Sequence, residues 1–287
     1  MHKKTTLKNG LRIITAPMEG TQTITVLVLV ATGSKYETKE INGLSHFLEH
    51  MFFKGTKKRP NTLAIAETLD RVGGEYNAFT SQETTGYWAK TDAGHLELAL
   101  DWVSDIFLNS KLEEKEIEKE RGVILGELNM YLDTPIKYIR NLWTDLLYGD
   151  QPAGWPVIGV KEAIKSVKRP QFVNYLKDHY LTKNTLITIA GKIDSNEAVE
   201  KIKKYFSKIR IGQPKTKLKV KEKQNQPASL IHYKKTDQTH LYLGVRAYGI
   251  FHPDKYALGI LATILGGYMS SRLWIAVRER EGLGYYI

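Results

Sequence analysis

Residues 43–56 read GLSHFLEHMFFKGT. The apolar side chains of this stretch recur at helical spacing: Leu44, Phe47, Leu48 and Met51. The pattern predicts a helix over residues 43–53 with one apolar face. His46 and His50 stand four positions apart in that helix, so they share a face and both imidazoles can reach one ion. The stretch therefore combines a packing helix with a candidate metal site.

Glu49 is the carboxylate beside this histidine pair. It is offset around the predicted helix, which suits holding a metal-bound water better than ligating the ion. Zinc takes His nitrogen and carboxylate oxygen, and a catalytic zinc keeps one position open for water. The alternative is two surface histidines and an unrelated glutamate on an amphipathic helix. The interleaved apolar residues argue against it, because burying these polar groups without an ion would be costly.

A third protein ligand has to come from another element. The helix predicted over residues 113–132 is rich in carboxylates, most of which are explained as a solvated face. Glu127 differs because it stands between Val123-Ile124-Leu125 and Leu128, in the most apolar part of that helix. A buried carboxylate there requires a cation. Glu120 lies two turns earlier on the same face.

Composition bounds the remaining possibilities. The 287 residues are 42% hydrophobic and include no cysteine, so a transition metal must be bound by His and carboxylate. The N-terminal residues carry positive charge without the apolar run of a secretory signal. The most apolar stretch, residues 24–31, is far too short to cross a bilayer. We therefore expect a cytoplasmic protein with no signal peptide and no membrane partner.

The net charge of +11 raises the question of nucleic acid. Basic residues are widely spread, and the densest run, residues 215–223 (KTKLKVKEK), has no interleaved aromatics. Two interpretations remain, a solvated basic linker and a nucleic-acid patch, and the absence of stacking residues favours the linker. Nucleic acid is not an expected partner.

The predicted order of elements is α+β rather than a regular alternation. Asn9-Gly10 predicts a hairpin over residues 6–17, and the continuous apolar run at residues 22–32 predicts a strand buried on both faces. Further strands are expected at residues 75–80, 84–90 and 185–190, and then at 230–233 and 240–246. We expect a first domain at residues 1–212, a linker at 213–228, and at 229–287 the start of a second domain that is incomplete at Ile287.

These residues resemble the pitrilysin (M16) metallopeptidases, whose zinc motif is H-x-x-E-H. The resemblance is strongest to the short bacterial type related to the mitochondrial processing peptidase. It rests on NGLRII, on residues 43–56, on residues 73–88 (GGEYNAFTSQETTGYW) and on residues 120–135 (ERGVILGELNMYLDTP). In the family a glutamate separated from the second histidine by 76 intervening residues completes the zinc site, and that position here is Glu127.

The resemblance implies roles for the site residues. His46, His50 and Glu127 would bind one Zn2+ per chain, with Glu49 as the base that activates the zinc-bound water and Glu120 supporting the site. The peptide substrate would pair with an edge strand at the following positions: Asn77, Ala78 and Phe79. From the chain's end, Arg278 and Tyr285, seven residues apart, would reach the substrate and stabilise the oxyanion.

The resemblance also implies a fold and an activity. The fold is a pair of similar α/β-sandwich domains of the pitrilysin or processing-peptidase type, with the second truncated here. The activity is that of a zinc metalloendopeptidase acting on oligopeptides or on unfolded or precursor segments, homodimeric in its full-length form. The alternatives are a non-catalytic family member, which typically loses the zinc residues, and a zinc hydrolase of other substrates, which no motif favours.

Overall fold

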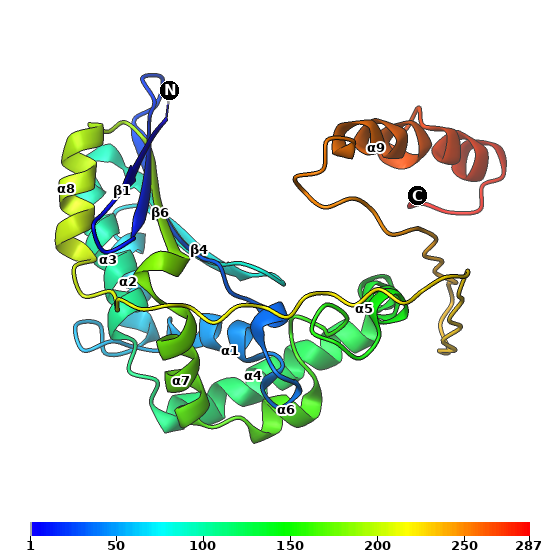
Figure 1. Cartoon of the computed structure of the whole chain (residues 1–287), viewed down its shortest axis with the longest axis horizontal. Helices are drawn as coiled ribbons and strands as arrows, with labels where there is room; N and C mark the ends of the chain where they lie inside the picture. Colours follow the sequence, from blue (N-terminus) through cyan, green and yellow to red (C-terminus); the bar gives the residue numbers. More distant parts are fainter. Residues whose placement is uncertain (1) are drawn as a thin grey trace. The chain divides into compact units, whose positions relative to one another are not determined.

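The structure is a computed structural model that describes residues 2–287. Contacts within the chain divide it into two compact units, Met1–His240 and Leu241–Ile287. Each unit is described by itself below (Figure 1).

The first unit is built on one mixed sheet of six strands in the order β1-β2-β6-β3-β5-β4. Only the pairing of β2 with β6 is parallel, and the other pairings are antiparallel. The strands are β1 (Lys3–Thr6), β2 (Arg12–Pro17), β3 (Thr23–Val30), β4 (Glu75–Thr80), β5 (Thr85–Asp92) and β6 (Thr185–Gly191). The predicted hairpin is confirmed: β1 pairs with β2 around Gly10, whose φ of 88° favours glycine.

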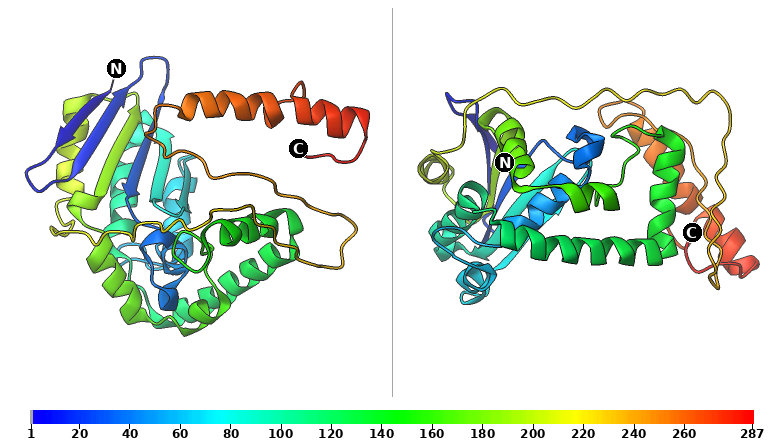
Figure 2. Two further views of the ribbon diagram at one scale, coloured as in Figure 1. Left: turned by 45° about the vertical axis from the view of Figure 1, so that its right-hand side comes forward. Right: turned by 90° about the horizontal axis from the view of Figure 1, so that it is seen from below.

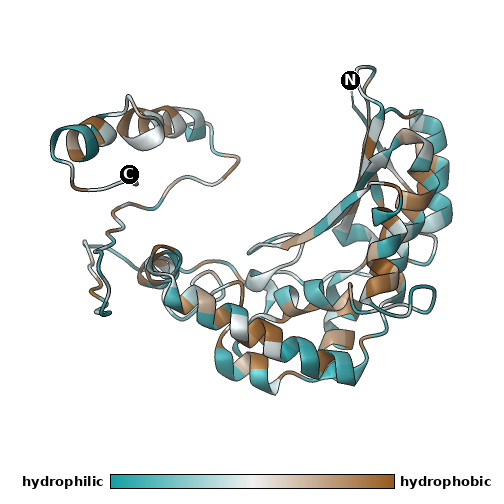
Figure 3. Cartoon of the chain, turned by 180° about the vertical axis from the view of Figure 1, so that it is seen from behind, coloured by the Kyte–Doolittle hydropathy of each residue, from teal (hydrophilic) through white to brown (hydrophobic). Residues whose placement is uncertain are grey.

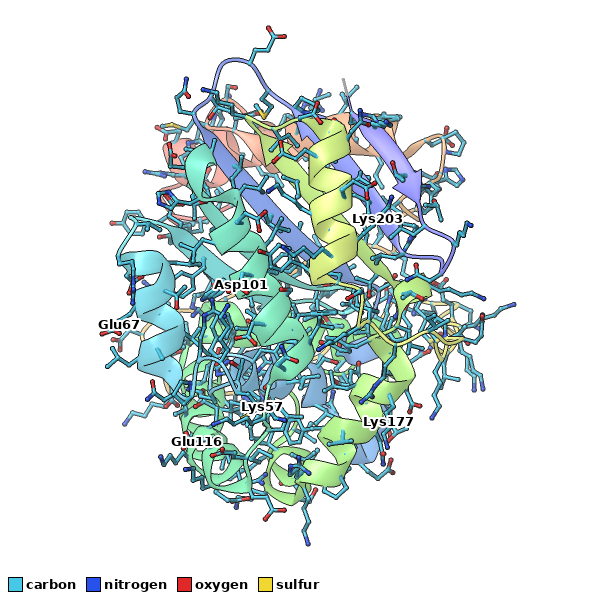
Figure 4. The ribbon with its side chains drawn as sticks, turned by 90° about the vertical axis from the view of Figure 1, so that its left-hand side faces the viewer. Lys57, Glu67, Asp101, Glu116, Lys177 and Lys203 are labelled. Atoms are coloured by element: carbon cyan, nitrogen blue, oxygen red, sulfur yellow. The ribbon has the colours of Figure 1, made fainter. Side chains whose placement is uncertain are left out.

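The described part of the first unit contains eight α-helices. They are α1 (Leu44–Met51), α2 (Thr62–Asp70), α3 (Leu96–Asn109), α4 (Glu114–Asp133), α5 (Pro135–Tyr148), α6 (Lys161–Ser166), α7 (Arg169–His179) and α8 (Ser195–Tyr205). Helices α3 and α8 lie side by side against one face of the sheet, where Asp101 and Lys203 mark them (Figure 4). The predicted α+β class is confirmed.

Strand β3 shows that the two faces of the sheet are unequal. Its residues alternate between buried and half-buried, with Ile24, Val26, Val28 and Val30 buried. The prediction that this strand is buried on both faces is wrong. Helix α3 packs on β3 and β5 from one side, so every second side chain enters the core and the alternate ones keep part of their surface exposed.

Helix α1 is anchored by its apolar face. Phe47, Leu48 and Met51 are almost completely buried, and so is Phe52 directly after the helix. The Phe52 ring stacks on Tyr87 of β5, with 4.7 Å between the ring centroids. Burying one such side chain contributes on the order of 2 kcal/mol, so the position of α1 relative to the sheet is strongly determined.

The N-terminus of α1 is capped from a distance. Its N-cap residue, Gly43, has no side chain and a φ of 95°, and a Cβ there would lie 2.6 Å from the Ile158 carbonyl oxygen. The buried Glu37 carboxylate takes the place of a local cap, accepting from Gly43 N (2.7 Å), Ser45 N (2.7 Å) and Asn42 Nδ2 (3.1 Å). Burial raises the pKa of Glu37, while the hydrogen bonds from Ser45 and its neighbours oppose that shift.

The chain after α8 is extended. From residue 212 to 240 it forms neither helix nor strand and runs as a long trace (Figure 2). Gln151 holds it through both backbone groups of Lys221: Nε2 donates to the carbonyl oxygen (3.0 Å), and Oε1 accepts from the amide (2.9 Å). The predicted strands at residues 230–233 and 240–246 are wrong, because no described backbone segment pairs with either.

The second unit is helical where it has regular structure. It contains α9 (Lys255–Ala262), η5 (Thr263–Gly267) and η6 (Trp274–Arg280). Across residues 2–287, none of the helices has both the length and the apolar character that crossing a bilayer requires.

We expect Glu37→Ala to lower the free energy of unfolding of the first unit by about 3 kcal/mol, because two buried helix N–H groups lose their acceptor. Urea unfolding followed by circular dichroism measures the change. Glu40→Ala, at an exposed site nearby, is the control and should leave the midpoint unchanged. Equal midpoints for Glu37→Ala and the unmutated protein would show that the distant cap contributes nothing.

Candidate metal centre

The two histidines of α1 lie side by side, as their spacing predicts. The Nε2 atoms of His46 and His50 are 3.3 Å apart, and the ring centroids are 4.7 Å apart. Helix α4 packs against α1 and brings Glu127 Oε2 to 3.7 Å from each Nε2 atom. The structure thus brings together three of the predicted site residues, which come from two helices.

This donor set fits a zinc ion. Two donors bound 2.0–2.2 Å from a tetrahedral ion lie about 3.3–3.5 Å apart, close to the three separations observed between His46, His50 and Glu127. Within the described chain, these residues form the one group of three or more His, Asp or Glu residues whose potential ligand atoms all lie within 4.8 Å of one another. Two imidazoles and one carboxylate leave a fourth position open, as in catalytic zinc sites.

The protonation of the histidines suits a metal. Burial, and then the neighbouring His50, lower the pKa of His46 to about 4, so its imidazole is neutral at pH 7. His50 Nδ1 lies 2.8 Å from Glu120 Oε1. Donation of the Nδ1 proton to that carboxylate leaves the Nε2 lone pair directed at the site, as is common for ligating histidines.

Glu120 and Glu127 lie two turns apart on α4 but have different partners. Glu120 is buried and bonds to Lys54 Nζ at 2.5 Å. Burial opposes its ionisation, but the hydrogen bonds from His50 and Lys54 outweigh that effect and lower its pKa. Among the described residues, Glu127 has ion pairs only with His46 and His50. Its charge is therefore left for a cation, whereas that of Glu120 is neutralised by Lys54.

The reason for singling out Glu127 from the sequence is corrected by the structure. Its side chain is 26% exposed, and its apolar neighbour Val123 and nearby Met130 are also exposed. Hydrophobic and hydrophilic residues are interspersed along the helices of the first unit (Figure 3). The apolar stretch does not bury Glu127, because α4 turns only one side towards the core. Proximity to the two histidines distinguishes this carboxylate.

Glu49 does not belong to this group, but the charges of His50 and Glu127 both act on its carboxylate. Its Oε2 accepts a 2.5 Å hydrogen bond from Thr80 Oγ1, at the end of β4. Burial raises the pKa of Glu49, and the Thr80 bond partly offsets the rise. Sequence reasoning missed Thr80 and Lys54. Thr80 lies 31 positions from Glu49 in the chain, and no local pattern marks that contact.

The predicted substrate strand is an edge strand. Among the strands of residues 2–287, β5 is the single partner of β4, so the other side of β4 is a sheet edge. At the hairpin, Ser81 N donates to Thr84 O (2.8 Å), so this is a hydrogen-bonded pair of residues. Hydrogen-bonded and non-hydrogen-bonded pairs alternate along antiparallel strands, so the backbone N–H and C=O groups of Ala78 and Thr80 point away from β5, to the open side. One of these outward-facing groups, the Ala78 N–H, donates to Asn77 Oδ1 at 2.8 Å. Phe79 is 41% exposed, and its ring lies over Gly86 on β5.

Arg278 and Tyr285 lie together in the second unit. Arg278 Nη1 donates to the backbone oxygen of Tyr285 at 3.3 Å, and its guanidinium is 6.0 Å from the Tyr285 ring centroid. The guanidinium also lies over Trp274, 4.2 Å from that ring centroid. The action of this pair on a substrate stays a prediction.

Comparison with known proteins identifies similar chains. A family model for insulinase (peptidase family M16) matches residues 12–160, and one for the peptidase M16 inactive domain matches residues 166–287. An uncharacterized zinc protease of Bacillus subtilis, YmxG, is 38% identical over 287 residues, covering 100% of this chain and 69% of the relative. An uncharacterized zinc protease of Mycobacterium leprae, ML0855, is 37% identical, covering 99% and 64%.

Solved structures agree with these matches. A protease from Helicobacter pylori superposes with a TM-score of 0.89 at 26% identity, covering 100% of this chain and 70% of that one. The periplasmic protease PqqL from Escherichia coli gives 0.71 at 25% identity, covering 78% and 26%. The chain thus spans about two thirds of the length of the bacterial zinc proteases it matches. The predicted resemblance is confirmed.

We expect Glu120→Gln to weaken zinc binding roughly 10- to 100-fold, because His50 loses the carboxylate that orients it. Competition with a fluorescent zinc chelator measures the affinity. Glu116→Gln, one turn earlier on α4, is the matched control and should bind zinc as the unmutated protein does. Unchanged affinity in Glu120→Gln would exclude this supporting role.

Proposed function

The chain belongs to the M16 family of peptidases, and on that premise we propose that it acts as a zinc-dependent endopeptidase on oligopeptides or unfolded segments. The observation that carries the proposal is the position of Glu49. Its half-buried carboxylate accepts a hydrogen bond from Thr80, and the charges of His50 and Glu127 act on it.

In the proposed hydrolysis, the metal ligands and Glu49 have distinct roles. A zinc ion bound by His46, His50 and Glu127 supplies Lewis-acid chemistry, which polarises a carbonyl and makes water more acidic. Glu49 takes a proton from the attacking water and transfers it to the leaving amine. A raised carboxyl pKa improves both transfers, since a base is most effective when its pKa approaches the working pH.

The substrate is held by its backbone in this proposal. An extended peptide adds to the open side of β4, where the backbone groups of Ala78 and Thr80 replace its bonds to water. Asn77 gives up its bond to Ala78 N as the peptide enters. Such pairing does not depend on the identity of the substrate's side chains, which suits an enzyme acting on many sequences.

We extend the proposal to the second unit and to assembly. Arg278 offers a fixed cation and Tyr285 a phenol hydroxyl, which together can stabilise an oxyanion. We propose that the full-length protein is a homodimer in which this pair serves the zinc site of the other copy.

Glu49→Gln tests the base. We expect it to retain about one zinc per chain while kcat for an internally quenched peptide falls about 10²- to 10⁴-fold, since only the proton acceptor is lost. Elemental analysis and fluorescence measure the two quantities. Glu67→Gln, on the exposed side of α2, is the control. A Glu49→Gln variant with full activity would overturn the proposed mechanism.

Thr80→Val tests how the base is held. We expect kcat to fall roughly fivefold with KM within about twofold, because one hydrogen bond worth about 1 kcal/mol no longer orients Glu49. Thr80→Ser keeps the hydroxyl and should restore most of kcat. Equal losses in the valine and serine variants would show that shape at Thr80, and not its hydroxyl, matters.

A further inference from the structure

A hollow of about 280 Å³ lies in the first unit beyond the end of β4. One wall is Ser81 and Gln82, the residues that follow β4, and Arg140 and Asn141 line the hollow from α5. Trp155 and its neighbours also line it. None of the site residues considered above lines it.

Arg140 is the one ionisable residue among those that line the hollow. No carboxylate of residues 2–287 forms an ion pair with its guanidinium. The other polar groups are largely occupied: Gln82 Nε2 donates to Ala153 O (3.3 Å), and Trp155 Nε1 donates to Asp150 Oδ1 (2.9 Å). Asp150 in turn pairs with Lys39 at 2.5 Å. The hollow therefore presents a cation with no matching anion.

The hollow adjoins the reacting groups along the chain. Ser81 directly follows Thr80, whose hydroxyl bonds to Glu49. Consecutive residues of a strand are about 3.4 Å apart, so one wall of the hollow lies within about two residues of the Glu49 contact. A peptide extending along β4 past Thr80 would bring a side chain near the cut bond to this wall.

We propose that this hollow is a substrate subsite in which Arg140 binds a carboxylate. Guanidinium binds carboxylate through two parallel hydrogen bonds, and Asn141, which also lines the hollow, carries an amide that can donate a third. The favoured ligand is the side chain of Asp or Glu close to the cleaved bond. A terminal α-carboxylate has the same chemistry, and the experiment separates the two. The inference rests on the proposed peptidase function.

The test uses internally quenched peptides that differ at single positions flanking the cleaved bond. Each position carries Asp, Asn or Lys, with the C-terminus amidated, and a further Asn peptide has a free C-terminus. We expect one position at which Asp raises kcat/KM about fivefold over Asn, a modest gain because solvent screens an exposed guanidinium. Arg140→Gln should abolish the preference, and Arg140→Glu should reverse it towards Lys.

Lys137→Gln is the matched control, since Lys137 lies one turn from Arg140 on α5 and contacts Tyr131 instead of the hollow. It should keep the preference for Asp. Equal rates for Asp and Asn at every position, or an equal loss in Lys137→Gln and Arg140→Gln, would overturn the subsite. A gain confined to the free C-terminus would assign Arg140 to a terminal carboxylate and exclude the side-chain role.

A binding measurement keeps the subsite separate from the peptidase proposal. If no peptide is cleaved, the peptidase proposal fails, and fluorescence anisotropy of labelled Asp and Asn peptides on Glu49→Gln protein then decides the subsite. Tighter binding of the Asp peptide that disappears in Glu49→Gln/Arg140→Gln supports it. Equal binding of both peptides overturns it.

Discussion

The packing of α1 against α4 determines the geometry of the candidate metal centre. α1 alone places two imidazoles on one face, but a two-ligand site binds zinc weakly, and α4 supplies both a third ligand atom and a partner for His50. The sheet, the aromatic contact of Phe52 and the distant cap from Glu37 all hold α1 in place. A shift of α1 by one ångström would separate atoms that one ion has to contact.

Two glutamates on one helix face show how surroundings assign chemical roles. Glu120 and Glu127 are seven positions apart, a spacing that puts both on the same face of α4. Lys54 distinguishes them, because its ammonium neutralises Glu120 and leaves that carboxylate to orient His50. In the part of the chain that the structure describes, Glu127 pairs with no lysine or arginine, so its charge is left for the ion. The same reasoning separates Glu49, which is held by a neutral hydroxyl and retains a raised pKa.

Short-range patterns carried most of what could be predicted. Helical spacing located α1 and its histidine pair, and Asn9-Gly10 located the first hairpin, because both depend on residues a few positions apart. Contacts such as Thr80 with Glu49 or Glu37 with Ser45 depend on the packing of separate elements, which no local pattern encodes. For the same reason the position of Glu127 was found while its burial was misjudged, since apolar neighbours along a helix do not reveal which side faces the core.

Backbone pairing on β4 and a charged subsite would answer different requirements of one substrate. Hydrogen bonds between strands repeat every two residues. A peptide paired with β4 can therefore shift by two residues and form the same pattern of backbone hydrogen bonds. Such slippage would move the bond presented to Glu49 along the peptide. A single carboxylate bound at Arg140 would make these registers unequal in energy. The register that places the carboxylate at Arg140, beyond Thr80, would be favoured. Main-chain recognition would then set how many sequences are accepted, and the guanidinium would select where each is cut.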